Sequence, residues 1–171
     1  MWRSSGRSSQ APANVSLEFV PMCFPRVELA SISNYWQSKL RNRAMPSRAD
    51  IDPGELKPLL PQILLVDVLW GGADFRYRLL GTRLTRYFPE RATGKTFREA
   101  LASFGEETVA GTLNVYRQIV EHRLPALVSG PGEYYHQEAK RFHAILTPLS
   151  DDGENVSMIF GAFEFERKNR D

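Results

Sequence analysis

The feature that most constrains the fold is a pair of long apolar segments near the end of the chain, residues 141–149 and 156–166. The residues between them, 150–155, read Ser-Asp-Asp-Gly-Glu-Asn, which is typical of a tight connection between antiparallel strands. The second segment is apolar on both faces, with Met158, Phe160 and Ala162 alternating with Ile159, Gly161 and Phe163. Such a strand must be covered twice, by the domain's own helices on one side and by the amino-terminal helices or a second subunit on the other.

Three earlier segments also have the composition of strands. Residues 63–70 and 75–80 are separated by Gly-Gly-Ala-Asp, so we predict that they form an antiparallel hairpin. Residues 124–129 form a third apolar run, which is followed by the turn sequence Gly-Pro-Gly. The chain therefore carries two predicted strands before a central helical region and three after it.

The clearest predicted helix is the segment 106–122, which precedes the third strand. Acidic residues open this segment and basic residues close it, as the helix dipole favours. Its apolar side chains recur at the spacing of one helical face, and they are Val109, Leu113, Tyr116 and Val120.

Two helices are predicted before the first strand. The first starts near residue 30, stops before the proline at position 46, and places Ile32, Trp36 and Leu40 on one apolar stripe. The second opens at Asp52, because Asp-Pro-Gly-Glu supplies an N-cap acid and a proline at the first helical position. We expect Thr82 to cap a further short helix directly after the second strand.

This order of elements predicts an α+β domain with one five-stranded antiparallel sheet, because strands at both ends of the domain must share a sheet if there is a single core. The expected boundaries follow from composition. A flexible amino-terminal tail covers 1–25, the amino-terminal helices 26–61, the sheet domain 62–167, and a carboxyl-terminal tail 168–171.

Composition and charge restrict the expected partners and compartment. A formal net charge of +2 over 171 residues is too small to indicate nucleic acid or an anionic membrane as a partner. Cys23 is the single cysteine, which excludes an intrachain disulfide and a multi-cysteine zinc site. The longest apolar run, 63–70, contains Asp67 and is too short for a membrane span. With no secretory signal at the amino terminus, we expect a cytoplasmic protein.

No motif for catalysis or metal binding is complete in this sequence. The Thr-Gly-Lys-Thr at 93–96 resembles the end of a phosphate-binding loop, but the glycine that the full pattern requires is replaced by Pro89. The His-Gln-Glu at 136–138 matches part of the zinc-deaminase pattern without its two downstream cysteines. We therefore predict no catalytic residue and no metal ligand.

Four short stretches form a recognisable set. They are Tyr-Trp at 35–36, Pro-Ser-Arg-Ala-Asp-Ile-Asp-Pro at 46–53, Leu-Leu-Pro at 59–61 and Phe-Arg-Tyr-Arg-Leu-Leu-Gly-Thr at 75–82. Together they resemble the standalone, mostly uncharacterised PAS-like proteins of alpha-proteobacteria, over roughly residues 32–165. The resemblance implies a PAS-like five-stranded sheet with helices on one face, an amino-terminal helical extension, and a sensing or regulatory role. It carries over no catalytic residue.

The resemblance also implies a cavity between the sheet and the helices that follow the second strand. The cavity is a candidate site for a small molecule, and the cofactor is left unspecified. A core filled by the same side chains is the alternative. The candidate lining residues are Tyr77, Leu84, Tyr87, Leu113, Tyr116, Phe142 and Phe160.

Three functions are compatible with these observations. The first is a PAS-like signalling homodimer, joined through the helix that carries Trp36 and the outer sheet face, that passes its state to an unknown protein partner. The second is a haem-binding sensor, because some PAS sensors ligate haem from the long helix that here ends in His122. The third is a small cavity-containing enzyme of the curved-sheet type, which needs an acid or base; the lining offers only tyrosines and, at its margin, His143.

Two arginines alternate with the apolar face of the second strand. Arg76 and Arg78 are expected on the opposite side of the sheet, because successive side chains of a strand point to opposite faces. There they are either solvated or paired with acids such as Glu164 and Glu166, or they anchor a ligand carboxylate or a partner.

Overall fold

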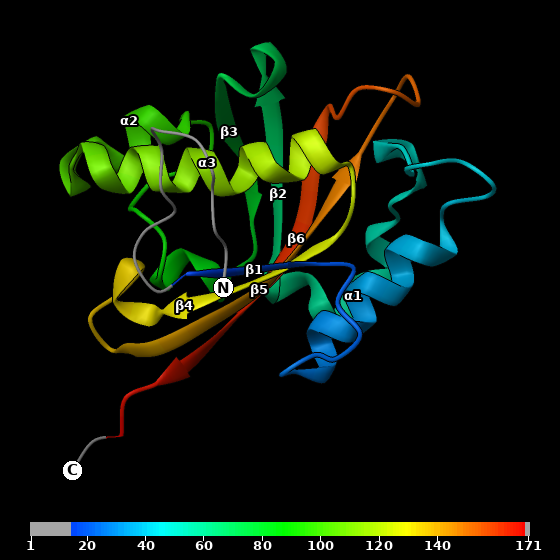
Figure 1. Cartoon of the computed structure of the whole chain (residues 1–171). Helices are drawn as coiled ribbons and strands as arrows, with labels where there is room; N and C mark the ends of the chain where they lie inside the picture. Colours follow the sequence, from blue (N-terminus) through cyan, green and yellow to red (C-terminus); the bar gives the residue numbers. More distant parts are fainter. Residues whose placement is uncertain (1–14, 170–171) are drawn as a thin grey trace.

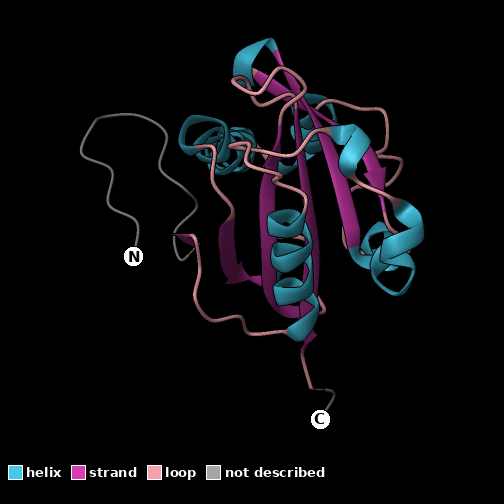
Figure 2. Ribbon diagram, turned by 90° about the vertical axis from the view of Figure 1, so that its right-hand side faces the viewer, coloured by secondary structure: helices cyan, strands magenta, loops and turns pink. Residues whose placement is uncertain are grey.

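A computed structural model of the chain describes residues 15–169 and contains one six-stranded antiparallel sheet with helices on both sides (Figures 1 and 2). The order of strands across the sheet is β1-β4-β5-β6-β2-β3. The strands are β1 (Ser16–Phe19), β2 (Ile63–Leu69), β3 (Asp74–Leu80), β4 (Ala126–Pro131), β5 (Ala139–Leu149) and β6 (Met158–Arg167).

Three α-helices and six short 3-10 helices connect these strands. The α-helices are α1 (Val27–Ser38), α2 (Phe97–Leu101) and α3 (Glu106–His122). The 3-10 helices are η1 (Arg48–Asp50), η2 (Pro53–Gln62), η3 (Trp70–Gly72), η4 (Leu84–Arg86), η5 (Ala102–Phe104) and η6 (Gly132–Tyr134). None of the helices within residues 15–169 has the length and apolar character needed to cross a membrane.

The predicted hairpin at the end of the chain is confirmed as β5 and β6. The two strands pair from Ala139 opposite Arg167 to Leu149 opposite Met158. The turn between them is organised by Asp152, whose carboxylate accepts hydrogen bonds from the Asn155 side chain and from the backbone N–H groups of Glu154 and Asn155. These bonds hold the pKa of Asp152 well below its usual value, so the carboxylate is ionised when it closes the turn.

The sheet has two covered faces, which we call inner and outer. The inner face lies against α2 and α3, where Phe75 packs on Phe97 and Tyr116. The outer face of β5 and β6 lies against α1, where the ring of Tyr35 contacts Phe160. Of the two covers expected for the last strand, the chain's own amino-terminal helix is therefore the one present.

Two side chains expected at a homodimer interface are buried within the single chain. Trp36 is only 4% exposed and Phe163 only 2%, because the first is buried between α1 and β5 and the second faces the inner layer. Neither side chain is available to a second subunit. The outer face of β5 and β6 is covered by α1, so a homodimer through the helix that carries Trp36 would have to use the solvent-facing side of that helix.

The structure also differs from the expected amino-terminal tail. Ser16–Phe19 form strand β1, which pairs antiparallel with β4 from Ser16 opposite Ser129 to Phe19 opposite Ala126. The ring of Phe19 stacks on His122 with 4.2 Å between ring centroids. The sheet therefore has six strands where five were expected, and the rest of the expected tail, residues 1–14, lies outside the described residues.

The short helices next to β2 and β3 match the sequence only in part. Asp52 is the N-cap of η2 as predicted, and its side chain accepts the backbone N–H of Gly54 at 2.8 Å. Thr82 does not cap the helix after β3. The N-cap residue of η4 is Arg83, and the carbonyl of Thr82 instead accepts the hydroxyl of Thr85.

Candidate functional site

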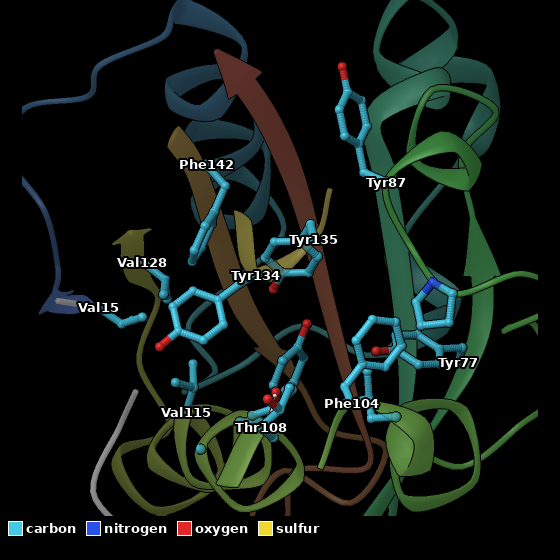
Figure 3. Close-up of a pocket in the computed structure, with 15 residues that line it drawn as sticks. Val15, Tyr77, Tyr87, Phe104, Thr108, Val115, Val128, Tyr134, Tyr135 and Phe142 are labelled. Atoms are coloured by element: carbon cyan, nitrogen blue, oxygen red, sulfur yellow. Dashed lines mark hydrogen bonds between the residues drawn. The ribbon is translucent and has the colours of Figure 1, made fainter. Parts of the chain in front are cut away.

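A small cavity lies between the inner face of the sheet and α3 (Figure 3). It offers about 50 Å³ of space for the centres of water molecules, which is enough for a few waters or a compact molecule. Pockets that hold drug-sized ligands are larger, at roughly 300–1,000 Å³. Aromatic side chains dominate the lining, and they are Tyr77, Tyr87, Phe104, Tyr116, Tyr134, Tyr135 and Phe142.

The structure brings together four of the seven side chains predicted to line the cavity. Tyr77, Tyr87, Tyr116 and Phe142 all border it, from β3, the segment after η4, α3 and β5. In Figure 3 the hydroxyl of Tyr87 points away from the other labelled side chains, and its ring stacks on Phe165 at 4.0 Å. Tyr87 is thus at the rim of the cavity.

The other three predicted residues are not part of this lining. Phe160 lies on the outer face of β6 against Tyr35, so its side chain is separated from the cavity by the sheet. Leu113 is buried in the core, because the cavity-facing residues of α3 are those around Thr108, Thr112 and Tyr116. Leu84 is the buried first residue of η4, and it borders a different cleft.

Two cavity residues that the sequence did not indicate are Tyr134 and Tyr135. They belong to η6 and the residue after it, in the connection between β4 and β5. The turn sequence before them predicts a surface loop, but the connection folds inward over the sheet, where Tyr135 packs on Phe142 and Phe163. Two adjacent tyrosines in a loop are the one signal that could have marked it.

Three tyrosine hydroxyls at the cavity have no hydrogen-bond partner among residues 15–169. They belong to Tyr77, Tyr116 and Tyr135, and the first two side chains are almost fully buried. Figure 3 shows the hydroxyls of Tyr77 and Tyr135 directed toward the space between the labelled side chains. Each hydroxyl can donate one hydrogen bond, so a ligand or water in the cavity can supply the acceptor.

The protonation state of these tyrosines follows from their burial. Burial raises the pKa of Tyr77 and Tyr116 well above the usual value, and it raises the pKa of Tyr135 as well. All three therefore stay neutral and able to donate at physiological pH. The lining contains no carboxylate, amine, imidazole or thiol. The cavity can thus offer hydrogen bonds and apolar contacts to a ligand, but no charge.

None of the three histidines lines the cavity, although the ring of His136 packs edge-on against Tyr87 at its rim. His122 stacks on Phe19 at the end of α3, and its Nδ1 is 3.0 Å from the carbonyl of Gln118, so it does not point into the cavity as a haem ligand must. His143 lies on the opposite face of the sheet, 2.8 Å from the hydroxyl of Ser129 and 3.1 Å from the carboxylate of Glu166.

The Ser129, His143 and Glu166 side chains form a hydrogen-bonded row across β4, β5 and β6. Nucleophile, base and acid are arranged similarly in hydrolases. Ser129 and His143 are each only 8% exposed, so the hydroxyl is not presented to a substrate. The hydrogen bond from His143 lowers the pKa of Glu166. The row links β4, β5 and β6 by side-chain hydrogen bonds. Its three residues are not part of the cavity lining, so they do not provide the acid or base that a cavity-containing enzyme needs there.

The arginines of β3 pair with an acid that was not expected. Arg76 Nε lies 3.1 Å from Asp67 Oδ2, and Arg78 lies 3.8 Å from the same oxygen. Asp67 is on the neighbouring strand β2, directly opposite Arg76. Pairing with an acid on another strand therefore occurs, but Glu164 and Glu166 are not the partners, because β2 lies between β6 and β3.

Comparisons with known proteins identify a family and show a distant structural likeness. A family model described as PAS domain matches residues 26–164. No curated protein matches the chain. Among solved structures, an RNA-binding Light-Oxygen-Voltage receptor is similar, with a TM-score of 0.47 and 17% sequence identity. The match covers 91% of this chain and 40% of the receptor chain, so this chain spans well under half of that protein's length.

Proposed function

The chain belongs to the PAS domain family, and from this premise we propose that it is a sensory domain whose state is set by a small, neutral molecule held between α3 and the sheet. The observation that carries the proposal is the set of hydroxyls of Tyr77, Tyr116 and Tyr135. They border an apolar cavity and have no hydrogen-bond partner among the described residues, and a ligand that brings an acceptor atom satisfies them.

The chemistry of the lining limits the ligand. An anionic ligand is disfavoured, because a charge buried beside phenols and methyl groups has no cation to pair with. Haem and flavin are much larger than a cavity of about 50 Å³. We infer a compact compound that is mostly apolar and carries one or two carbonyl, ether or hydroxyl oxygens.

Binding is favoured over catalysis by the same lining. General acid–base chemistry at neutral pH needs a group that exchanges a proton near that pH. The raised pKa values of the cavity tyrosines place them far from this condition. We therefore propose that the domain is not an enzyme and that the ligand leaves the cavity unchanged.

We further propose a homodimer through exposed apolar side chains just before and at the start of α1, the helix that carries Trp36. Val20, Met22 and Val27 lie close together in sequence, before and at the start of α1, and they are 50%, 88% and 74% exposed. Exposed apolar side chains that cluster often mark an interface. Sedimentation velocity should show a dimer for the natural chain and a monomer for a Met22→Glu, Val27→Glu double variant. A natural chain that is monomeric in the same experiment would contradict this proposal.

Two finer assignments are also proposals. The stretches at 35–36, 46–53 and 75–82 favour the alpha-proteobacterial group of PAS-like proteins. Cys23, exposed and free, favours a reducing compartment such as the cytoplasm.

A comparison of native and denatured masses tests the proposed sensory function. The purified protein should carry a non-covalent mass increment in the native spectrum that disappears on denaturation, and chromatography of the released compound should identify a neutral molecule. A native mass equal to that of the bare polypeptide, even after incubation with a library of neutral carbonyl compounds and ethers, would overturn the small-molecule proposal.

A further inference from the structure

The second half of β6 has one edge without a partner strand. β5 pairs with β6 along its whole length to Arg167, whereas β2 pairs with it only as far as Ala162. No other strand among the described residues pairs with 163–167 on the β2 side, and no backbone hydrogen bond outside the named strands uses these residues. An open edge of this kind presents N–H and C=O groups that can bind another extended chain.

The open edge forms one wall of a cleft of about 440 Å³. The opposite wall is η4 with its flanking residues, including Arg83 and Tyr87, and Gln62 lies at the inner end where β2 begins. Tyr87 borders both this cleft and the tyrosine-lined cavity, so the two share a wall. The cleft is thus separate from the cavity but in contact with it.

Two buried polar atoms in this cleft have no hydrogen-bond partner in the described chain. They are Gln62 Nε2, a donor on a side chain that is 4% exposed, and Glu164 Oε1, an acceptor. Burial raises the pKa of Glu164, and Glu28 adds to the increase, as expected for a carboxylate that lacks a donor. Leaving such atoms unpaired costs free energy, which a ligand that supplies both an acceptor and a donor would recover.

The walls of the cleft are positively charged. Arg83, Arg86 and Arg167 line it, against the single carboxylate of Glu164. Arg86 and Arg167 share Glu138, at 2.8 and 3.8 Å. Arg83 has no ion pair within 4.0 Å among the described residues, and its charge acts on Glu164, whose pKa it lowers against the larger effect of burial. The excess of guanidinium groups favours an acidic occupant.

We propose that this cleft binds an extended, acidic peptide segment of a partner protein, which adds as a strand to the open edge of β6. The backbone of such a segment supplies an acceptor for Gln62 Nε2 and a donor for Glu164 Oε1, while its acidic side chains pair with Arg83 and Arg86. A free anion satisfies only the Gln62 donor and is repelled by Glu164. At about 3.3 Å per residue, the edge accommodates a segment of four or five residues.

The test is a titration of uniformly ¹⁵N-labelled protein with acetyl-Asp-Val-Glu-Val-Asp-amide, followed by two-dimensional NMR. Backbone amides of 163–167 and the side-chain amide of Gln62 should shift together and saturate. The probe acetyl-Lys-Val-Lys-Val-Lys-amide has the same strand propensity and the opposite charge, and it should cause no saturable shift at these amides.

Two variants distinguish binding from a structural role. Arg83→Gln should raise the dissociation constant of the acidic probe about tenfold, whereas Arg78→Gln, an exposed arginine on β3, should leave it unchanged. Gln62→Leu should also weaken the probe while leaving thermal stability equal or higher, because it removes an unpaired buried amide.

Three results overturn the proposal. One is the absence of saturable shifts at 163–167 with the acidic probe, and another is an equal response to the lysine probe. The third is a concentration-dependent dimer that occupies this edge, which would make a second copy of the chain the occupant. These results do not test the small-molecule proposal for the cavity, which is tested by the native mass measurement. The two proposals can therefore fail independently.

Discussion

The indole N–H of Trp36 donates to the carbonyl oxygen of Pro148 across 2.7 Å, and this buried bond fastens α1 to the outer face of the sheet. Pro148 lies opposite Ile159, and the neighbouring Leu149 carbonyl accepts the backbone N–H of Ser157, the residue before β6. Because carbonyls alternate in direction along a strand, that of Pro148 points away from β6 and depends on the indole. The helix that covers the sheet thus also completes its hydrogen bonding.

Replacing this tryptophan should destabilise the fold. Trp36→Phe keeps an aromatic ring but leaves the Pro148 carbonyl buried and unpaired, so the free energy of unfolding should fall by about 1–3 kcal/mol. Trp36→Ala should cost about 3–5 kcal/mol, since it also leaves a cavity. Urea denaturation measures both, and Trp70→Phe, at a side chain 78% exposed, is the matched control with an expected change within about 0.5 kcal/mol. A Trp36→Phe protein as stable as the natural one would contradict the role of the bond.

Gly81 is required by a close approach of two backbone segments. A Cβ atom at this position would overlap the carbonyl groups of Leu60 and Pro61, at the end of η2. The two segments are held there by backbone bonds from Gly81 to Ile63 and from Arg83 to Pro61. Gly81→Ala should therefore lower the free energy of unfolding by about 1–3 kcal/mol or more. At Gly54 an added Cβ meets only the flexible Asp52 side chain, so Gly54→Ala should be nearly neutral in the same urea titration.

Sequence periodicity predicted the helices and strands whose pattern is contained within their own residues. The helix α3 was predicted with its observed ends, because its apolar spacing and its terminal charges agree. Strand β1 was missed, since four residues from Ser16 gain their structure from pairing with β4 and carry little signal of their own. The requirement for glycine at position 81 is not visible in its own segment, because it comes from η2, about twenty residues earlier.

The cavity was predicted in part for a similar reason. Tyr77 and Tyr116 were placed correctly because strand alternation and helical spacing fix the side of the element on which they lie. Phe160 was misplaced, because β6 is apolar on both faces and its pattern does not say which side meets α1. Tyr135 was missed, because the way a loop folds over a sheet depends on tertiary contacts that periodicity does not record.

Removing one cavity hydroxyl should separate ligand binding from stability. Tyr116→Phe deletes a donor that has no partner in the chain, so thermal stability of the ligand-free protein should stay the same or rise slightly. The affinity for the bound compound should fall about tenfold or more, measured by the fraction of protein that carries the native mass increment.

The matched control for that variant is Tyr35→Phe. The hydroxyl of Tyr35 donates to Glu55 at 2.7 Å and accepts the backbone N–H of Asp52 at 2.9 Å, outside the cavity. Its removal should cost about 1–2 kcal/mol of stability and leave the mass increment unchanged. A Tyr116→Phe protein that loses stability and keeps its ligand would reverse the assignment of the two tyrosines.

Asp50 should make stability depend on pH in the acid range. Its carboxylate accepts the backbone N–H of Ser47 at 2.8 Å and pairs with Arg43 at 2.7 Å, and these contacts lower its pKa to about 2. Because the folded pKa lies below the unfolded value, this contribution is complete above about pH 4–5 and is lost as the pH falls toward 2. Asp50→Ala should cost about 1–2 kcal/mol at pH 7, from the lost cap and ion pair, and progressively less between pH 5 and 2. Urea titrations of both proteins at several pH values measure this difference, and a difference that stays constant over that range would show that the carboxylate does not titrate with folding.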